Sequence, residues 1–106
     1  MPRPLPRLGL ISLAAFSLFG CGPAQLGEHE ECFKEVDTLY TAVTGRSPKL
    51  LDDCDRRLHE LKEAGKLPGP ASRALGAVVA KARRGEWGAA AKDLHAFMKG
   101  QRRPRK

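Results

Sequence analysis

Apolar residues recur every three or four positions along residues 28–99, and glycine and proline interrupt this pattern at a few points. Such spacing marks one face of an α-helix, and no stretch alternates with the two-residue period of a strand. The interruptions are Gly45, Gly65 with Pro68-Gly69-Pro70, Gly85 and Gly100. The pattern therefore predicts an all-α domain of about four helices.

Each predicted helix carries one apolar stripe, which must be buried against the others. The stripes are Cys32, Val36, Leu39 and Val43 with Phe33 and Tyr40 beside them; Leu51, Cys54, Leu58 and Leu61; Ala71, Leu75, Val78, Val79 and Ala82; and Trp87, Ala90, Ala91, Leu94, Phe97 and Met98. Small residues in the second half should let its two helices approach closely: Ala74, Gly76, Ala77, Ala89, Ala90 and Ala91. Two antiparallel hairpins, about 28–65 and 70–99, would pack together as a small bundle.

The helix boundaries follow from capping chemistry. Gly45 should end the first helix, and Ser47 should cap the second, which runs from Pro48 to about Ala64. Serine accepts a hydrogen bond from a free N–H of the first turn, and proline loses nothing at the first helical position. The third helix is expected over about 71–83 and the fourth from about Glu86 to residue 99.

Residues 1–20 have the order of a secretory signal. Arg3 and Arg7 supply positive charge without any acid, and an uncharged run follows from Leu8 to Phe19. Twelve helical residues reach about 18 Å, whereas the hydrocarbon core of a bilayer is about 30 Å thick. A basic start followed by a short apolar run and small residues is typical of an export segment.

The sequence Leu18-Phe19-Gly20-Cys21 resembles the lipobox of bacterial lipoproteins, in which leucine, a variable residue, a small residue and cysteine precede lipidation and cleavage. The resemblance implies cleavage between Gly20 and Cys21 and acyl chains, such as palmitate, on Cys21. Glycine at position 22, in place of an inner-membrane retention aspartate, implies the outer membrane with the domain facing the periplasm. The alternative is a cytosolic protein with a buried first helix, in which Cys21 is an ordinary thiol.

Charge is divided unevenly along the remaining chain. Residues 21–65 contain 6 basic and 10 acidic side chains, and residues 66–106 contain 11 basic and 2 acidic ones. We expect residues 21–27 to be a tether and residues 100–106 to be a disordered basic tail. The tail cations expected to contact anionic lipid head groups or lipopolysaccharide phosphates are Arg102, Arg103, Arg105 and Lys106. The alternative is a solvated tail that aids solubility; nucleic acid does not fit an exported location, and no aromatic residue interleaves the cluster.

Cys32 and Cys54 form a candidate disulfide, because an oxidising periplasm permits one. Closing this loop of 23 residues would stabilise a small domain by about 3 kcal/mol. In a straight hairpin that turns near Arg46, however, Cys54 faces Leu39 or Tyr40 and Cys32 faces Leu61, which offsets the two cysteines by about 10 Å. A disulfide then needs a steep helix crossing or a longer turn, and the alternative is two buried thiols.

The sequence predicts no metal, no cofactor and no catalytic site. His29, Cys32, Cys54 and His59 include metal-ligand types, but their spacing fits no single face and no Cys-x-x-Cys pair exists. The three histidines, with His95, are expected to be solvated or partly packed. Glu30, Glu31 and Glu35 are interpreted as an exposed acidic face, and no phosphate loop or nucleophile elbow occurs.

These features lead to two hypotheses of different kinds. The first is a non-enzymatic envelope lipoprotein whose helical bundle serves as an interaction or structural module. The alternative is a periplasmic carrier of a small ligand or a metal, using the bundle interior near Trp87, Phe97, Cys32 and Cys54.

Overall fold

The computed structural model describes residues 24–102, which form four α-helices and no strand. The helices are α2 (Glu30–Thr44), α3 (Pro48–Glu63), α4 (Gly69–Arg83) and α5 (Trp87–Lys99). This confirms the all-α bundle that the apolar spacing predicts. The signal segment, the cleavage position Gly20, the lipid position Cys21 and the tail cations Arg103, Arg105 and Lys106 lie outside the described residues.

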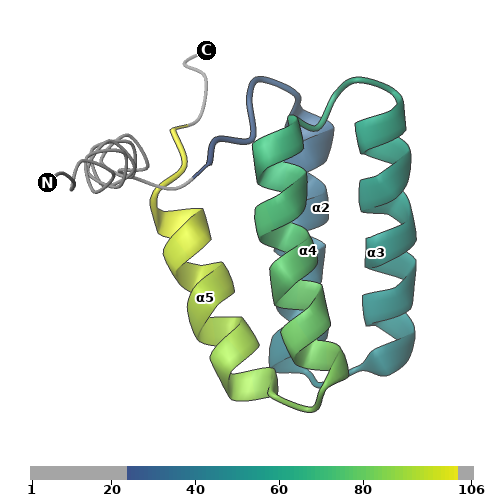
Figure 1. Ribbon diagram of the computed structural model, residues 1–106, viewed down its shortest axis with the longest axis vertical. Helices are drawn as coiled ribbons and strands as arrows, with labels where there is room; N and C mark the ends of the chain where they lie inside the picture. Colours follow the sequence, from purple (N-terminus) through teal and green to yellow (C-terminus); the bar gives the residue numbers. More distant parts are fainter. Residues whose placement is uncertain (1–23, 103–106) are drawn as a thin grey trace, which may run out of the picture.

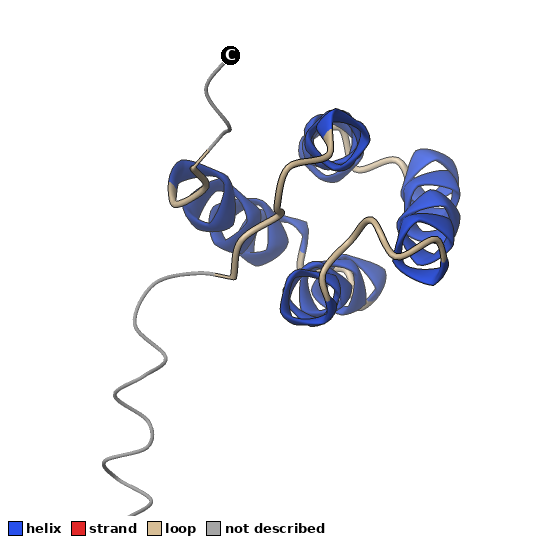
Figure 2. Cartoon of the chain, turned by 90° about the horizontal axis from the view of Figure 1, so that it is seen from above, coloured by secondary structure: helices blue, strands red, loops and turns tan. Residues whose placement is uncertain are grey.

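The four helices run alternately up and down and surround one core (Figure 1). Seen from above, they stand at four corners, and α5 returns to pack against α2 (Figure 2). We call the end that holds residues 24–29 and 100–102 the terminal end. The opposite end holds the turns 45–47 and 84–86, and we call it the hairpin end.

The predicted start of α3 is confirmed. Ser47 is the N-cap, its hydroxyl accepts a hydrogen bond from the N–H of Leu50 at 3.2 Å, and Pro48 is the first helical residue. The cap satisfies one of the free donors of the first turn. Serine and proline together thus fix where the second helix of the first hairpin begins.

Helices α2, α3 and α4 end in the same hydrogen-bonding motif, in which an N–H beyond the helix reaches a carbonyl five residues back. The bonds are Ser47 N to Ala42 O, Lys66 N to Leu61 O and Glu86 N to Lys81 O, at 3.0, 2.9 and 3.0 Å. The residue before each donor has a positive φ: 51° at Arg46, 78° at Gly65 and 86° at Gly85. Gly45 is the C-cap of α2, as predicted, with a φ of −86°, and the left-handed residue is Arg46, one position later.

The core is built from the predicted stripes. All residues buried in the described part of the chain are apolar or cysteine, and Tyr40, Leu61, Trp87, Ala91 and Met98 pack partly buried around them. Two buried residues lie outside the helices: Leu26, which is 1% exposed, and Leu67. Both cover the core at the terminal end.

The small residues expected to bring α4 and α5 close together do not all lie between them. Gly76, Ala77 and Ala89 are exposed, and Ala90 is fully buried.

Ion pairs connect neighbouring helices around the bundle. Arg57 of α3 contacts Glu35 of α2 at 2.9 Å, and Arg83 of α4 contacts Asp52 and Asp55 of α3 at 2.6 and 3.0 Å. The pair between Arg83 and Asp52 is exposed and contributes at most about 1 kcal/mol, so the apolar core provides most of the stability. Within the described residues, no helix has both the length and the apolar character needed to cross a bilayer.

Candidate functional site

Gln25 joins the N-terminal segment to the C-terminal one at the terminal end. Its Nε2 donates a hydrogen bond to the carbonyl of Gly100 at 3.0 Å, and its Oε1 accepts one from the N–H of Arg102 at 2.9 Å. A side-chain amide offers both donors and an acceptor, so it can pair with an extended backbone much as a neighbouring strand would. Residues 75 to 77 positions apart are thereby held together.

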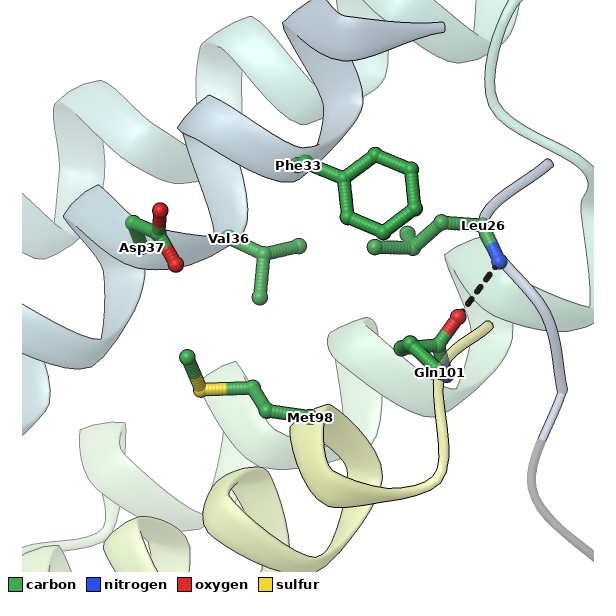
Figure 3. A pocket seen from close by; sticks show the side chains of 6 residues that line it. All are labelled: Leu26, Phe33, Val36, Asp37, Met98 and Gln101. Carbon is green, nitrogen blue, oxygen red and sulfur yellow. Dashed lines mark hydrogen bonds between the residues drawn. The ribbon is translucent and has the colours of Figure 1, made fainter. Parts of the chain in front are cut away.

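Gln101 makes the reciprocal connection. Its Oε1 accepts from the N–H of Leu26 at 2.7 Å (Figure 3), and its Nε2 donates to the carbonyls of Ala24 and Phe97 at 2.7 and 3.1 Å. We call this arrangement of Gln25 and Gln101 the glutamine clasp. Segments that the sequence suggested were a tether and a tail therefore belong, over residues 24–27 and 100–102, to the folded body.

A cleft lies beside the clasp, between α2 and α5. Its volume is about 330 Å³, and it is lined by Leu26, Phe33, Val36, Asp37, Met98 and Gln101. Figure 3 shows the apolar side chains in the middle, with Asp37 at one side and Gln101 at the other. The flexible thioether of Met98 can adjust to the shape of an occupant. The cleft thus combines apolar walls with one carboxylate and one amide.

Cys32 and Cys54 are free, buried thiols in the structure. Sγ of Cys32 donates to the carbonyl of Lys66 at 3.5 Å, whereas Cys54 lies beside Arg57. The bond between Glu35 and Arg57 explains why the two cysteines do not pair. Those residues are 22 positions apart and centred on Arg46, so α2 and α3 are in the straight register that offsets the cysteines.

Glu35 differs from the exposed acidic face that the sequence suggested. Its side chain is only 12% exposed, because it faces α3, where Arg57 compensates its charge. Its Oε2 is buried and has no hydrogen-bond partner among the described residues. Burial, and after it the neighbouring Glu35, raises the pKa of Cys54 to about 11. Burial also raises the pKa of Cys32, so neither thiol is an activated nucleophile at neutral pH.

The histidines lie apart on the surface. His29 precedes α2 without capping it, Nδ1 of His59 lies 2.8 Å from the carbonyl oxygen of Asp55, and the ring of His95 lies 6.3 Å from that of Tyr40. In the part of the chain that the structure describes, no three His, Cys, Asp or Glu side chains are grouped as metal ligands.

Comparison with protein-family models, curated proteins and solved structures gives no match. The functional argument therefore rests on the chain itself. Sequence reasoning placed Arg102 in a free tail and missed the clasp entirely. A glutamine on each side of the helical domain is the only signal in the sequence, and it becomes meaningful once both segments lie at the same end.

Proposed function

We propose that this chain is a lipid-anchored protein of the bacterial cell envelope whose helical bundle is a non-catalytic interaction module. The glutamine clasp is the observation that best supports the proposal. It fixes Ala24 to the bundle, and the expected lipid-bearing residue, Cys21, is only three positions before Ala24. Three extended residues span at most about 10 Å, so the anchor would hold the terminal end close to the membrane surface.

The basic tail supports the same orientation. Gln25 binds the backbone N–H of Arg102, and Arg103, Arg105 and Lys106 follow directly in the sequence. The anchor and the cations would thus leave the bundle at one end and meet the same membrane. A cation near an anionic surface contributes about 1 kcal/mol, which adds to the anchoring by acyl chains.

The absence of activated groups in the described core favours a binding role over catalysis. Both core thiols have raised pKa values. Glu35 lines a hollow of about 190 Å³ together with Glu31 and Glu60. Arg57 and Lys66 line the same hollow and pair with Glu35 and Glu31 at 2.9 Å each, so these two carboxylates are engaged in ion pairs. We further propose that the domain faces the periplasm from the outer membrane, as the resemblance to lipoproteins implies for Gly22.

Intact-mass measurement tests the anchor directly. The protein is extracted from membranes beside a Cys21→Ala variant, and its terminal peptides are mapped. We expect a chain that begins at an acylated Cys21 in the parent only. A soluble, unprocessed chain that begins at Met1 would overturn the proposed location.

A second candidate function is the carriage of a small apolar molecule in the cleft between α2 and α5. The apolar walls formed by Leu26, Phe33, Val36 and Met98 favour it. The cleft lies beside Phe33, whereas the interior around Cys32, Cys54 and Phe97 is filled by buried side chains. Native mass spectrometry after gentle purification should then detect a stoichiometric extra mass that a Val36→Trp variant lacks; a bare parent chain would exclude a resident ligand.

A further inference from the structure

Trp87 occupies an unusual position at the hairpin end. It is the only tryptophan of the chain, and it is partly buried between two hollows. The larger hollow, about 400 Å³, is lined by Pro48, Leu51, Asp52, Ala82, Arg83, Gly85 and Trp87. The smaller, about 190 Å³, is lined by Val43, Thr44, Arg46, Trp87, Gly88 and Ala91. Tryptophan is enriched at the centre of protein-binding surfaces, and here both hollows beside it could take side chains of a partner.

Four cations lie at the same end of the bundle as this tryptophan, and two of them, Arg46 and Arg83, line the hollows beside it. Arg46 and Lys49 are exposed on the α2–α3 turn and the first turn of α3, and Arg83 and Arg84 are exposed at the end of α4. The acidic side chains nearby are already engaged: Asp52 binds Arg83 at 2.6 Å, and Glu86 contacts Arg84 at 3.3 Å. These pairs also occupy Arg83 and Arg84, so Arg46 and Lys49 are the cations of the hairpin end that have no acidic partner among the described residues.

Arg46 has a left-handed backbone conformation that glycine adopts more easily. Its φ is 51°, and the equivalent positions at the ends of α3 and α4 are occupied by Gly65 and Gly85. A left-handed conformation is unfavourable for a residue with a Cβ. Strained residues of this kind are concentrated at functional sites, and here the strain presents a guanidinium beside the smaller hollow.

We propose that the hairpin end is a docking surface for an acidic polypeptide segment of another envelope protein. The apolar side chains of the segment occupy the hollows beside Trp87, and its carboxylates pair with Arg46 and Lys49. Arginine suits this role because its planar guanidinium can bind a carboxylate through two hydrogen bonds. The inference deepens the proposed function by stating the chemistry of the partner.

The geometry favours a different protein over a second copy. The bundle is about 20–24 Å long, so the hairpin end would point away from the membrane when the terminal end faces it. The exposed glutamates Glu28, Glu30 and Glu63 of this chain lie at the terminal end. The exposed acids of the hairpin end, Asp52 and Glu86, pair with Arg83 and Arg84 of their own chain. Two copies anchored in one membrane stand side by side, so the hairpin end of one cannot reach the glutamates at the terminal end of the other.

Fluorescence of Trp87 tests the docking surface. The purified full chain is titrated in solution with a twelve-residue peptide of glutamate, leucine and alanine, and with the same peptide carrying lysine for glutamate. We expect a saturable blue shift with the acidic peptide only. Arg46→Glu should weaken binding at least tenfold, whereas Lys92→Glu, the same charge change on the exposed face of α5, should leave it unchanged.

Arg46→Gly separates a binding role from a structural one. Glycine suits the left-handed backbone, so this variant should fold at least as well as the parent and still bind the peptide several-fold more weakly. No shift at about 1 mM peptide, or equal losses in Arg46→Glu and Lys92→Glu, would overturn the proposal. A blue shift of the Trp87 fluorescence caused by anionic vesicles alone would also overturn it, as would self-association detected by sedimentation. None of these readouts depends on acylation, so a failure here is distinct from a failure of the anchor.

Discussion

At the scale of single residues, the side chain of Gln101 joins the two ends of the described chain. Its side chain makes three hydrogen bonds to backbone groups of residues 24, 26 and 97. A hydrogen bond contributes about 1 kcal/mol net, and more is lost when a partly buried partner is left unpaired. This amide therefore shares the attachment of residues 24–27 with Gln25 and with the buried side chain of Leu26.

Gln101→Ala should therefore lower the free energy of unfolding by about 1–3 kcal/mol and release residues 24–27 from the bundle. Chemical denaturation measures the first effect, and hydrogen exchange at the N–H of Leu26 measures the second. Lys99→Ala is the matched control, because Lys99 is exposed in the last turn of α5 and should change stability little. Unchanged protection of Leu26 in Gln101→Ala would contradict the role assigned to the clasp.

Cys54 makes stability depend on pH in the alkaline range. Its pKa is raised from 9.0 to about 11 in the folded chain, so the folded state retains a proton that the unfolded state has lost. The free energy of unfolding therefore keeps its full value below pH 9 and falls by on the order of 2 kcal/mol as the pH rises toward 11. Denaturation at pH 8 and pH 11 should show this loss in the parent and a smaller one in Cys54→Ala; equal losses would mean that other groups are responsible.

At the scale of the elements, the ends of α2, α3 and α4 form a natural comparison. All three use one motif, but Arg46 takes the position that Gly65 and Gly85 take elsewhere. A Cβ at Gly65 or Gly85 would meet no atom within 4 Å, so substitution there changes the backbone strain without a packing clash.

Two opposite substitutions follow from this comparison. Arg46→Gly should raise the free energy of unfolding by about 1 kcal/mol, and Gly65→Ala should lower it by about the same amount. Thermal unfolding of the two variants beside the parent measures both effects. Destabilisation by Arg46→Gly would show that its side chain has a structural contact that outweighs the backbone strain.

At the scale of the whole molecule, the two hairpins form one body because α5 packs on α2 and α4 on α3. The clasp and Leu26 complete this body at the terminal end. A domain of about 80 residues has a free energy of unfolding of about 4–12 kcal/mol, so one buried side chain outside the helices is a considerable part of it.

Leu26→Ala should consequently lower the free energy of unfolding by about 2–4 kcal/mol while the transition remains cooperative. Chemical denaturation followed by circular dichroism gives both values. Leu50→Ala serves as the control, because Leu50 is only partly buried and its truncation should cost less. A negligible effect at Leu26 would mean that residues 24–27 do not contribute to folding.

The sequence by itself determined the helices, because apolar spacing, Ser47-Pro48 and the glycine and proline breaks act through contacts within a few residues. Only the tertiary structure decided that Glu35 is buried against Arg57, that Cys32 and Cys54 are separate thiols, and that the two glutamines form the clasp. Each of these depends on the register or the position of elements distant in sequence, and local periodicity carries no information about either. The hairpin end combines both levels: the turns can be predicted from glycine, whereas the placement of Arg46 beside Trp87 required the fold.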